Sequence, residues 1–199
     1  MTVDRHIIDC FCAPRAQRSP GPNRSVLFLL RRDLEKLYGA ESRKHIRTHK
    51  APMLAVLGMM AGIELLAKFN TGKATQTTNN DFKEFLVGYG NLTRAKAEVL
   101  YQYRCALAHS YGLYTMKRAS GKRPRSFKFS LDDSPRCSCL IEKLSYNHYV
   151  ISFWQMKQLF LHCVESLKAC LRSPDSRNHR MLVKNFVRVV KRIGYIRIS

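Results

Sequence analysis

The sequence has few acidic residues for its length. Its 199 residues include 14 Asp and Glu against 35 Lys and Arg, which gives a formal net charge of +21 at pH 7. The acids are scattered, and Asp132-Asp133 is the only adjacent acidic pair. A nuclease that holds its metal ions with carboxylates needs several such side chains grouped together. We therefore predict no metal and no other cofactor.

Familiar catalytic signatures are also missing. The sequence contains neither G-x-x-x-x-G-K-[ST] nor G-x-G-x-x-G, and neither G-x-S-x-G nor H-E-x-x-H. These patterns place phosphates on a backbone loop, expose a nucleophilic serine, or hold zinc on one helix face. The sequence therefore gives no support to the commonest nucleotide-binding, serine-hydrolase and zinc-protease classes.

Long apolar runs are absent as well. No stretch without a charged residue is longer than 13 residues, the length of Ala51–Ile63, whereas a membrane-spanning helix needs roughly 20. Asp9 interrupts the first apolar run, so we expect no signal peptide. The seven cysteines are odd in number and include two C-x-C pairs, which are set too close for a typical zinc site. We predict free thiols in a cytoplasmic protein without a membrane segment.

Positive charge is what the sequence has in excess. Hydrophobic residues make up 45% of it, which is enough for one globular core. A charge of +21 repels itself unless anions neutralise it. Nucleic acid is the commonest polyanion that meets such a surface, and an anionic membrane surface comes second. RNA or DNA is therefore the predicted partner, and we predict no membrane contact.

Helical periodicity dominates the sequence. Apolar residues recur at helical spacing in six segments, which predicts helices over 25–38, 53–69, 81–89, 93–114, 153–171 and part of 178–199. Partial alternation predicts a small basic loop or β-hairpin insertion within 117–150. The fold class expected is all-α, a bundle of five to six helices. We expect a flexible basic tail over 1–24, a helical domain over 25–171, and a basic helix and tail over 172–199.

Two residues of the predicted helix 93–114 suggest chemistry. Arg104 and His109 are five residues apart, which on an ideal helix is about 140° in direction and about 7.5 Å in height. They would not share a face. Either the helix bends or ends near Gly112, or the two residues converge on a cleft built with something else, such as a second copy of the chain.

This pair suits cleavage of RNA. A histidine can take the proton from a ribose 2′-hydroxyl, and an arginine can hold the phosphate and stabilise its growing charge. We therefore predict His109 and Arg104 as catalytic residues that need no metal. Ser110 could donate a hydrogen bond to phosphate, and Tyr111 or Tyr103 could stack on a base. The alternative is that Arg104 and His109 only bond within the bundle.

A basic segment follows the pair along the chain. Its cations are predicted to contact nucleic-acid phosphates, with help from the C-terminal basic helix. They are Lys117, Arg118, Lys122, Arg123, Arg125 and Lys128.

The stretch Arg104-Cys-Ala-Leu-Ala-His109 resembles the signature of HEPN domains, an arginine followed after four to six residues by a histidine. The aromatic approach LYQYR and the following HSYGLY are similar too. The resemblance covers about residues 25–171 and implies an all-α bundle that forms a homodimer, with two motifs facing one cleft. Many members are metal-independent endoribonucleases of toxin–antitoxin or other defence systems. Catalytic members often carry a polar residue where this chain has Cys105.

Three functions remain open on the sequence. The first is a metal-independent endoribonuclease, which would lose cleavage with His109. The second is a non-catalytic module that binds RNA or DNA through phosphates. The third is a helical interaction protein that pairs with an acidic partner, such as an antitoxin or a nucleotidyltransferase subunit.

Overall fold

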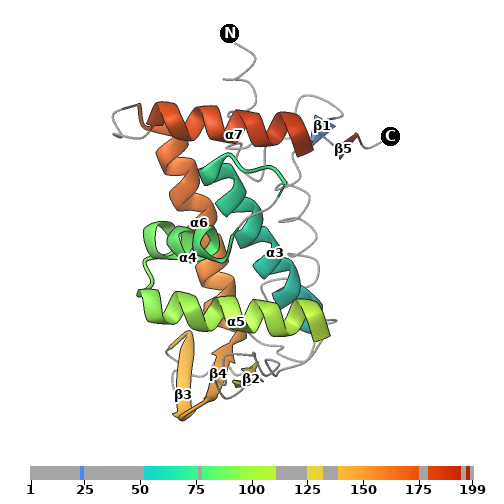
Figure 1. Ribbon diagram of the computed structural model, residues 1–199, viewed down its shortest axis with the longest axis vertical. Coiled ribbons are helices and arrows are strands. Elements are labelled where there is room, and N and C mark those ends of the chain that lie inside the picture. The colour runs from blue at the N-terminus through green and yellow to red at the C-terminus, as the bar shows by residue number, and fades with distance from the viewer. Residues whose placement is uncertain are drawn as a thin grey trace, which may run out of the picture.

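The structure is a computed structural model, and it describes residues 23–24, 52–75, 78–110, 125–131, 139–174, 179–193 and 196–197. The described part is mostly helical and carries a small three-stranded sheet (Figure 1). Its helices are α3 (Pro52–Thr71), α4 (Asn79–Tyr89), α5 (Arg94–Ser110), α6 (Phe153–Arg172) and α7 (His179–Ile193). The predicted helices over 53–69, 81–89 and 153–171 are confirmed within a residue or two. The helix predicted over 25–38 lies outside the described residues.

Helices α3 and α6 form the centre of the fold. They run side by side, α7 crosses one end of the pair, and α5 crosses towards the other (Figure 1). The apolar periodicity of α6 explains its position, since Phe153, Phe160 and Val164 are all buried. Burying an aromatic or aliphatic side chain of this size contributes about 1.5–3 kcal/mol to folding. The bundle is therefore held mainly by the contacts of its two central helices.

Helix α3 is apolar on nearly all sides. By length and composition it is the one helix in the described ranges that could cross a membrane, and its most apolar window of 18 residues is 50% buried inside the protein. It packs against α4, α6 and α7. A helix that is apolar all round belongs in the middle of a bundle, which agrees with its position here. A cytoplasmic location stays a prediction.

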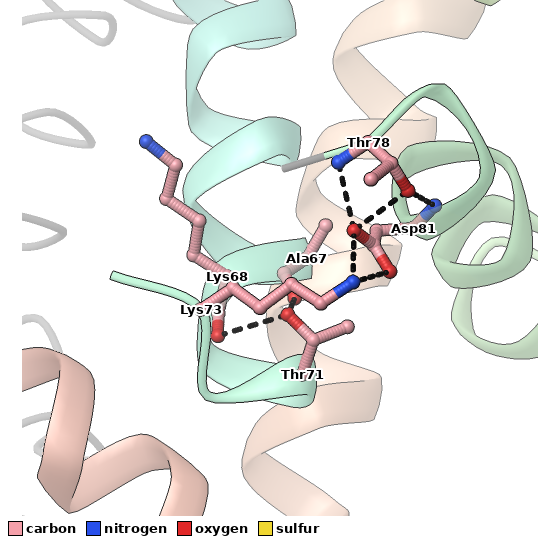
Figure 2. Close-up of polar contacts among 6 residues, drawn as sticks. All are labelled: Ala67, Lys68, Thr71, Lys73, Thr78 and Asp81. Atoms are coloured by element: carbon pink, nitrogen blue, oxygen red, sulfur yellow. Dashed lines mark hydrogen bonds and ion pairs between the residues drawn. The ribbon is translucent and has the colours of Figure 1, made fainter. Parts of the chain in front are cut away.

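A capping box starts helix α4. The Thr78 hydroxyl accepts a hydrogen bond from the Asp81 backbone N–H (3.2 Å), and the Asp81 carboxylate accepts one from the Thr78 N–H (2.7 Å; Figure 2). Lys73 adds an ion pair to the same carboxylate at 2.8 Å. The sequence predicted that this helix begins at Asp81, but it begins two residues earlier, at Asn79. Thr78 is the cap, and Asp81 lies three residues inside, because the two side chains satisfy each other's backbone donors.

Asp81→Asn is expected to destabilise the protein at neutral pH and to matter less in acid. Burial acts to raise the pKa of Asp81, but hydrogen bonds from Lys73 and Thr78 outweigh it and lower the pKa below its ordinary value of 3.8. A lowered pKa means that the charged form stabilises the fold above 3.8 and that this stability is lost as the pH falls further. Urea denaturation of both proteins from pH 7 to pH 2.5 measures the difference. If the difference in the free energy of unfolding between the two proteins stayed constant with pH, this role of the carboxylate would be contradicted.

The three-stranded sheet packs beneath α5. Strands β3 (Ile141–Ser145) and β4 (His148–Ser152) form an antiparallel hairpin, and β2 (Ser126–Ser130) pairs with β4 in parallel. The sequence predicted a basic loop or a hairpin within 117–150, and the hairpin lies at 141–152, with β2 added to it as a third strand. Strand β4 runs straight into α6, where Ser152 caps the helix by accepting from the Gln155 N–H.

A short strand pair joins the two ends of the described chain. β1 (Asn23–Arg24) pairs antiparallel with β5 (Ile196–Arg197). The last two residues of the predicted tail over 1–24 are therefore part of a strand. Residues 1–22 lie outside the described residues. The predicted C-terminal tail contains the short strand β5.

Helix α7 is fastened to the end of α3. The Asn185 side-chain amide donates to the Asn70 carbonyl at 2.8 Å, and Phe186 packs on Phe69 with ring centroids 4.9 Å apart. Gly72 has a φ of 74° directly after α3, and a Cβ there would stand 2.6 Å from the Asn185 side chain. Glycine at this position provides both the left-handed turn and the space. These contacts fix which face of α7 is buried.

Candidate functional site

Arg104 lies on α5, and its guanidinium is paired with a carboxylate from the neighbouring central helix. Its Nη2 donates to Glu64 of α3. Both side chains are mostly enclosed, with 25% of Arg104 and 23% of Glu64 exposed. A charge pair enclosed to this degree is costly to break from one side, because the remaining charge is left without its partner.

The electrostatics keep Arg104 charged. Burial acts to lower its pKa, but the charge of Glu64, a hydrogen bond to Glu64 and the neighbouring Cys105 raise it above its ordinary value. An arginine carries five N–H donors, which is more than the bond to Glu64 uses. Arg104 is therefore a permanently charged, oriented donor at the edge of the bundle, which is what holding a phosphate requires.

His109 and Ser110 occupy the last turn of α5. The helix continues through Ser110, so Arg104 and His109 keep the helical offset of about 140° and about 7.5 Å. A bend near Gly112 would come after both residues and would not change this offset. The side chains of His109 and Ser110, and all of Tyr111 and Gly112, lie outside the described residues. The helix is continuous from Arg94 to Ser110, so no bend within the described residues brings Arg104 and His109 of one chain together, and convergence through another element or another copy stays a prediction.

Tyr103 is a core residue. It is fully buried and packs on Phe127 of β2 with ring centroids 5.2 Å apart, and Phe127 in turn stacks on Tyr149 of β4. The prediction that Tyr103 could stack on a base is wrong for this structure, because its ring joins α5 to the sheet. Burial also raises the pKa of its phenol. The Tyr103 hydroxyl has no hydrogen-bond partner among the residues that the structure describes.

Tyr103→Phe is therefore expected to stabilise the protein by about 1 kcal/mol, since it removes a buried polar group that makes no bond. Tyr89→Phe is the matched control. Its hydroxyl donates to the Asn70 side chain at 3.0 Å, so its removal should destabilise by about 1 kcal/mol. Urea denaturation of the two variants measures the direction of both changes in the free energy of unfolding. A Tyr103→Phe protein less stable than the parent would show that the hydroxyl does bond in solution.

The predicted phosphate-binding cations divide into three groups. Lys117, Arg118, Lys122 and Arg123 lie outside the described residues. Arg125 is half-buried, its guanidinium lies 5.4 Å from the centroid of the Tyr149 ring, and its charge helps to lower the pKa of Glu98. Lys128 is exposed on β2. Of the six, the structure thus gives Arg125 a packing role and leaves Lys128 open to an anion.

A second charge network lies between α4 and α5. Lys83 is buried, pairs with Glu98 at 2.8 Å, and lies 5.7 Å from the centroid of the Tyr101 ring. Burial acts to raise the pKa of Glu98, but bonds from Lys83 and Gln102 outweigh it and lower the pKa. This network joins the two helices, and we assign it a structural role.

Sequence reasoning missed the partner of Arg104. Glu64 is the one acidic residue in α3 (Pro52–Thr71), a helix that is otherwise mostly apolar. A lone acid on an apolar central helix is costly without a cation, and this signal could have predicted an ion pair there. It could not have named Arg104, which is 40 residues away.

The described residues contain no group of three or more His, Cys, Asp or Glu side chains that could hold a metal ion. No family model, no curated protein and no solved structure matches this chain. The functional argument therefore depends on the residues and their geometry.

Proposed function

We propose that this chain is a metal-independent endoribonuclease of the HEPN type, with Arg104 and His109 as its catalytic residues. The observation that supports it most is the Arg104–Glu64 pair. It holds the motif arginine, partly enclosed, between two packed helices. Catalytic groups are most effective where packing and neighbouring side chains fix their orientation. The net charge of +21 attracts the RNA substrate.

In the proposed reaction the RNA supplies its own nucleophile. His109 removes the proton from a ribose 2′-hydroxyl, and the oxygen attacks the adjacent phosphorus. Arg104 binds the non-bridging oxygens and stabilises the charge that builds on them. The bond to the 5′-oxygen breaks, and this oxygen takes a proton from water or from an imidazolium. The products end in a 2′,3′-cyclic phosphate and a 5′-hydroxyl.

We further propose that two copies of the chain form the site. Five helical residues keep Arg104 and His109 of one chain on different faces. A two-fold axis near the end of α5 would bring Arg104 of one copy towards His109 of the other, because such an axis repeats the same surface on both sides. Ser110 and Tyr111 would then lie near the shared cleft.

The test is cleavage of a labelled RNA in EDTA, beside the same sequence with 2′-O-methyl groups. The proposal predicts that the RNA is cut and that the methylated strand survives, since it lacks the nucleophile. Cleavage that stops in EDTA, or equal cutting of both strands, would contradict it.

A non-catalytic RNA-binding protein is the second candidate. The observation in its favour is the net charge of +21, which attracts RNA whether or not Arg104 and His109 cleave it. It predicts RNA binding that weakens steeply with salt and that survives His109→Ala. Association with an antitoxin or a nucleotidyltransferase subunit stays a prediction. Co-purification of such a partner tests it.

A further inference from the structure

The outer face of α7 carries a row of cations. The helix has five Lys and Arg side chains and no acidic residue. All five are exposed, and they are Arg180, Lys184, Arg188, Lys191 and Arg192. Arg180, Lys184 and Arg188 are spaced four residues apart, and Lys191 comes three residues after Arg188. On a helix these four fall within about 80° of arc and extend over about 16 Å.

Within the part of the chain that the structure describes, no acidic neighbour neutralises the first three cations of this row. Arg180, Lys184 and Arg188 form no ion pair with any residue in the described ranges, whereas Lys73 and Arg94 elsewhere each pair with a carboxylate. Neighbouring like charges on a helix face repel each other. An exposed row of this kind is therefore stabilised by binding an extended anion.

The opposite face of α7 is already occupied. Leu182, Phe186, Val189 and Val190 are buried in the core, and the Asn185 bond to α3 fixes the rotation of the helix. An amphipathic basic helix that lies in a membrane interface inserts its apolar face between the lipids. In α7 that face is unavailable, which leaves only charge to recognise a partner.

We propose that the outer face of α7 is a docking surface for the phosphate backbone of RNA, separate from the site on α5. Helix α7 crosses the end of the α3–α6 pair opposite α5 (Figure 1). Cations spaced at about 5–6 Å along a helix suit the regular charges of a nucleic-acid strand. The surface reads charge and not base sequence. It shares with the proposed function the assumption that RNA is the ligand, but it does not depend on cleavage.

The test uses a 2′-O-methyl RNA strand, which the proposed reaction cannot cut. Its binding is followed by fluorescence anisotropy over a salt series, with the parent and with R180Q/K184Q/R188Q. Removing three phosphate contacts should reduce the slope of log K against log salt by about 2. Between about 50 and about 200 mM salt, the parent should therefore lose about 20-fold more affinity than the variant.

Two further variants serve as controls. K73Q/R94Q/K143Q removes the same charge from scattered exposed positions, and its salt slope should equal that of the parent. R180K/K184R/R188K keeps the charge and should bind as the parent does. It also shows whether changes on this face disturb folding, which circular dichroism checks for every variant.

Three results would overturn the proposal. The first is no binding by the parent at low salt. The second is an equal loss of slope in the two glutamine variants, which would mean that net charge alone matters. The third is unchanged RNA binding by R180Q/K184Q/R188Q together with lost binding to phosphatidylserine vesicles, which would assign the face to a membrane. Binding without cleavage would contradict the proposed enzyme and leave this surface standing.

Discussion

His109→Ala is expected to lower RNA cleavage by about 10²–10⁴-fold and to leave the fold intact. The imidazole is the only group in the proposed site whose ordinary pKa allows it to exchange a proton near neutral pH. Arg104 cannot replace it, because Glu64 and the intrinsic basicity of the guanidinium keep the arginine charged. Without His109 the 2′-hydroxyl loses its base, while phosphate binding remains.

The comparison needs a histidine that is changed without touching the site. His162 is exposed on α6, and its imidazole hydrogen-bonds to Ser166 in the next turn of the helix. His162→Ala should therefore cleave as the parent does. Initial rates on one labelled RNA, with circular dichroism of all three proteins, measure the effect. If His109→Ala cleaved as fast as His162→Ala, His109 would have no catalytic role.

Glu64→Gln is expected to have the second largest effect, on both stability and cleavage. The change keeps the size of the side chain but removes the charge that faces Arg104. Bonds between a charged group and a partly enclosed partner contribute about 1.5–3 kcal/mol, so we expect a loss of about 1–2 kcal/mol in the free energy of unfolding. Arg104 would also lose its fixed orientation, and cleavage should fall by about 10-fold or more.

Glu84→Gln is the matched control for this change. Glu84 pairs with Arg94 across α4 and α5, but the two side chains are 58% and 55% exposed. Exposed pairs of this kind contribute about 0–1 kcal/mol, so the variant should remain nearly as stable and as active as the parent. Urea denaturation and initial rates give both quantities. A Glu64→Gln protein that matched Glu84→Gln in both would show that the Glu64 pair neither supports the fold nor positions Arg104.

The helices were predictable because their apolar periodicity reflects burial. The same pattern predicts that Tyr103 is buried, because it falls on the apolar face of α5 with Leu100 and Leu107. The prediction that it stacks on a base relied on its position next to Arg104 and neglected the helical spacing of the apolar residues. The capping box was also readable, since Thr78 and Asp81 have the required spacing.

Other features depend on contacts that a local pattern does not contain. The pairing of Glu64 with Arg104 follows from how α3 and α5 cross. The parallel addition of β2 to β4 requires a connection whose path the alternation of Phe127 and Phe129 does not specify. The open face of α7 needed the structure as well. Its amphipathic pattern was visible in the sequence, but the partners of its apolar side were not.

The central claim is that Arg104 and His109 cleave RNA without a metal, and the end groups of the products test it most directly. RNA would be incubated with the wild-type protein in EDTA, and the new 3′ ends would be identified by mass spectrometry. We predict 2′,3′-cyclic phosphates paired with 5′-hydroxyl ends. Intact RNA would contradict the claim. So would products that end in a 3′-hydroxyl and a 5′-phosphate, because attack by the 2′-oxygen cannot produce these ends.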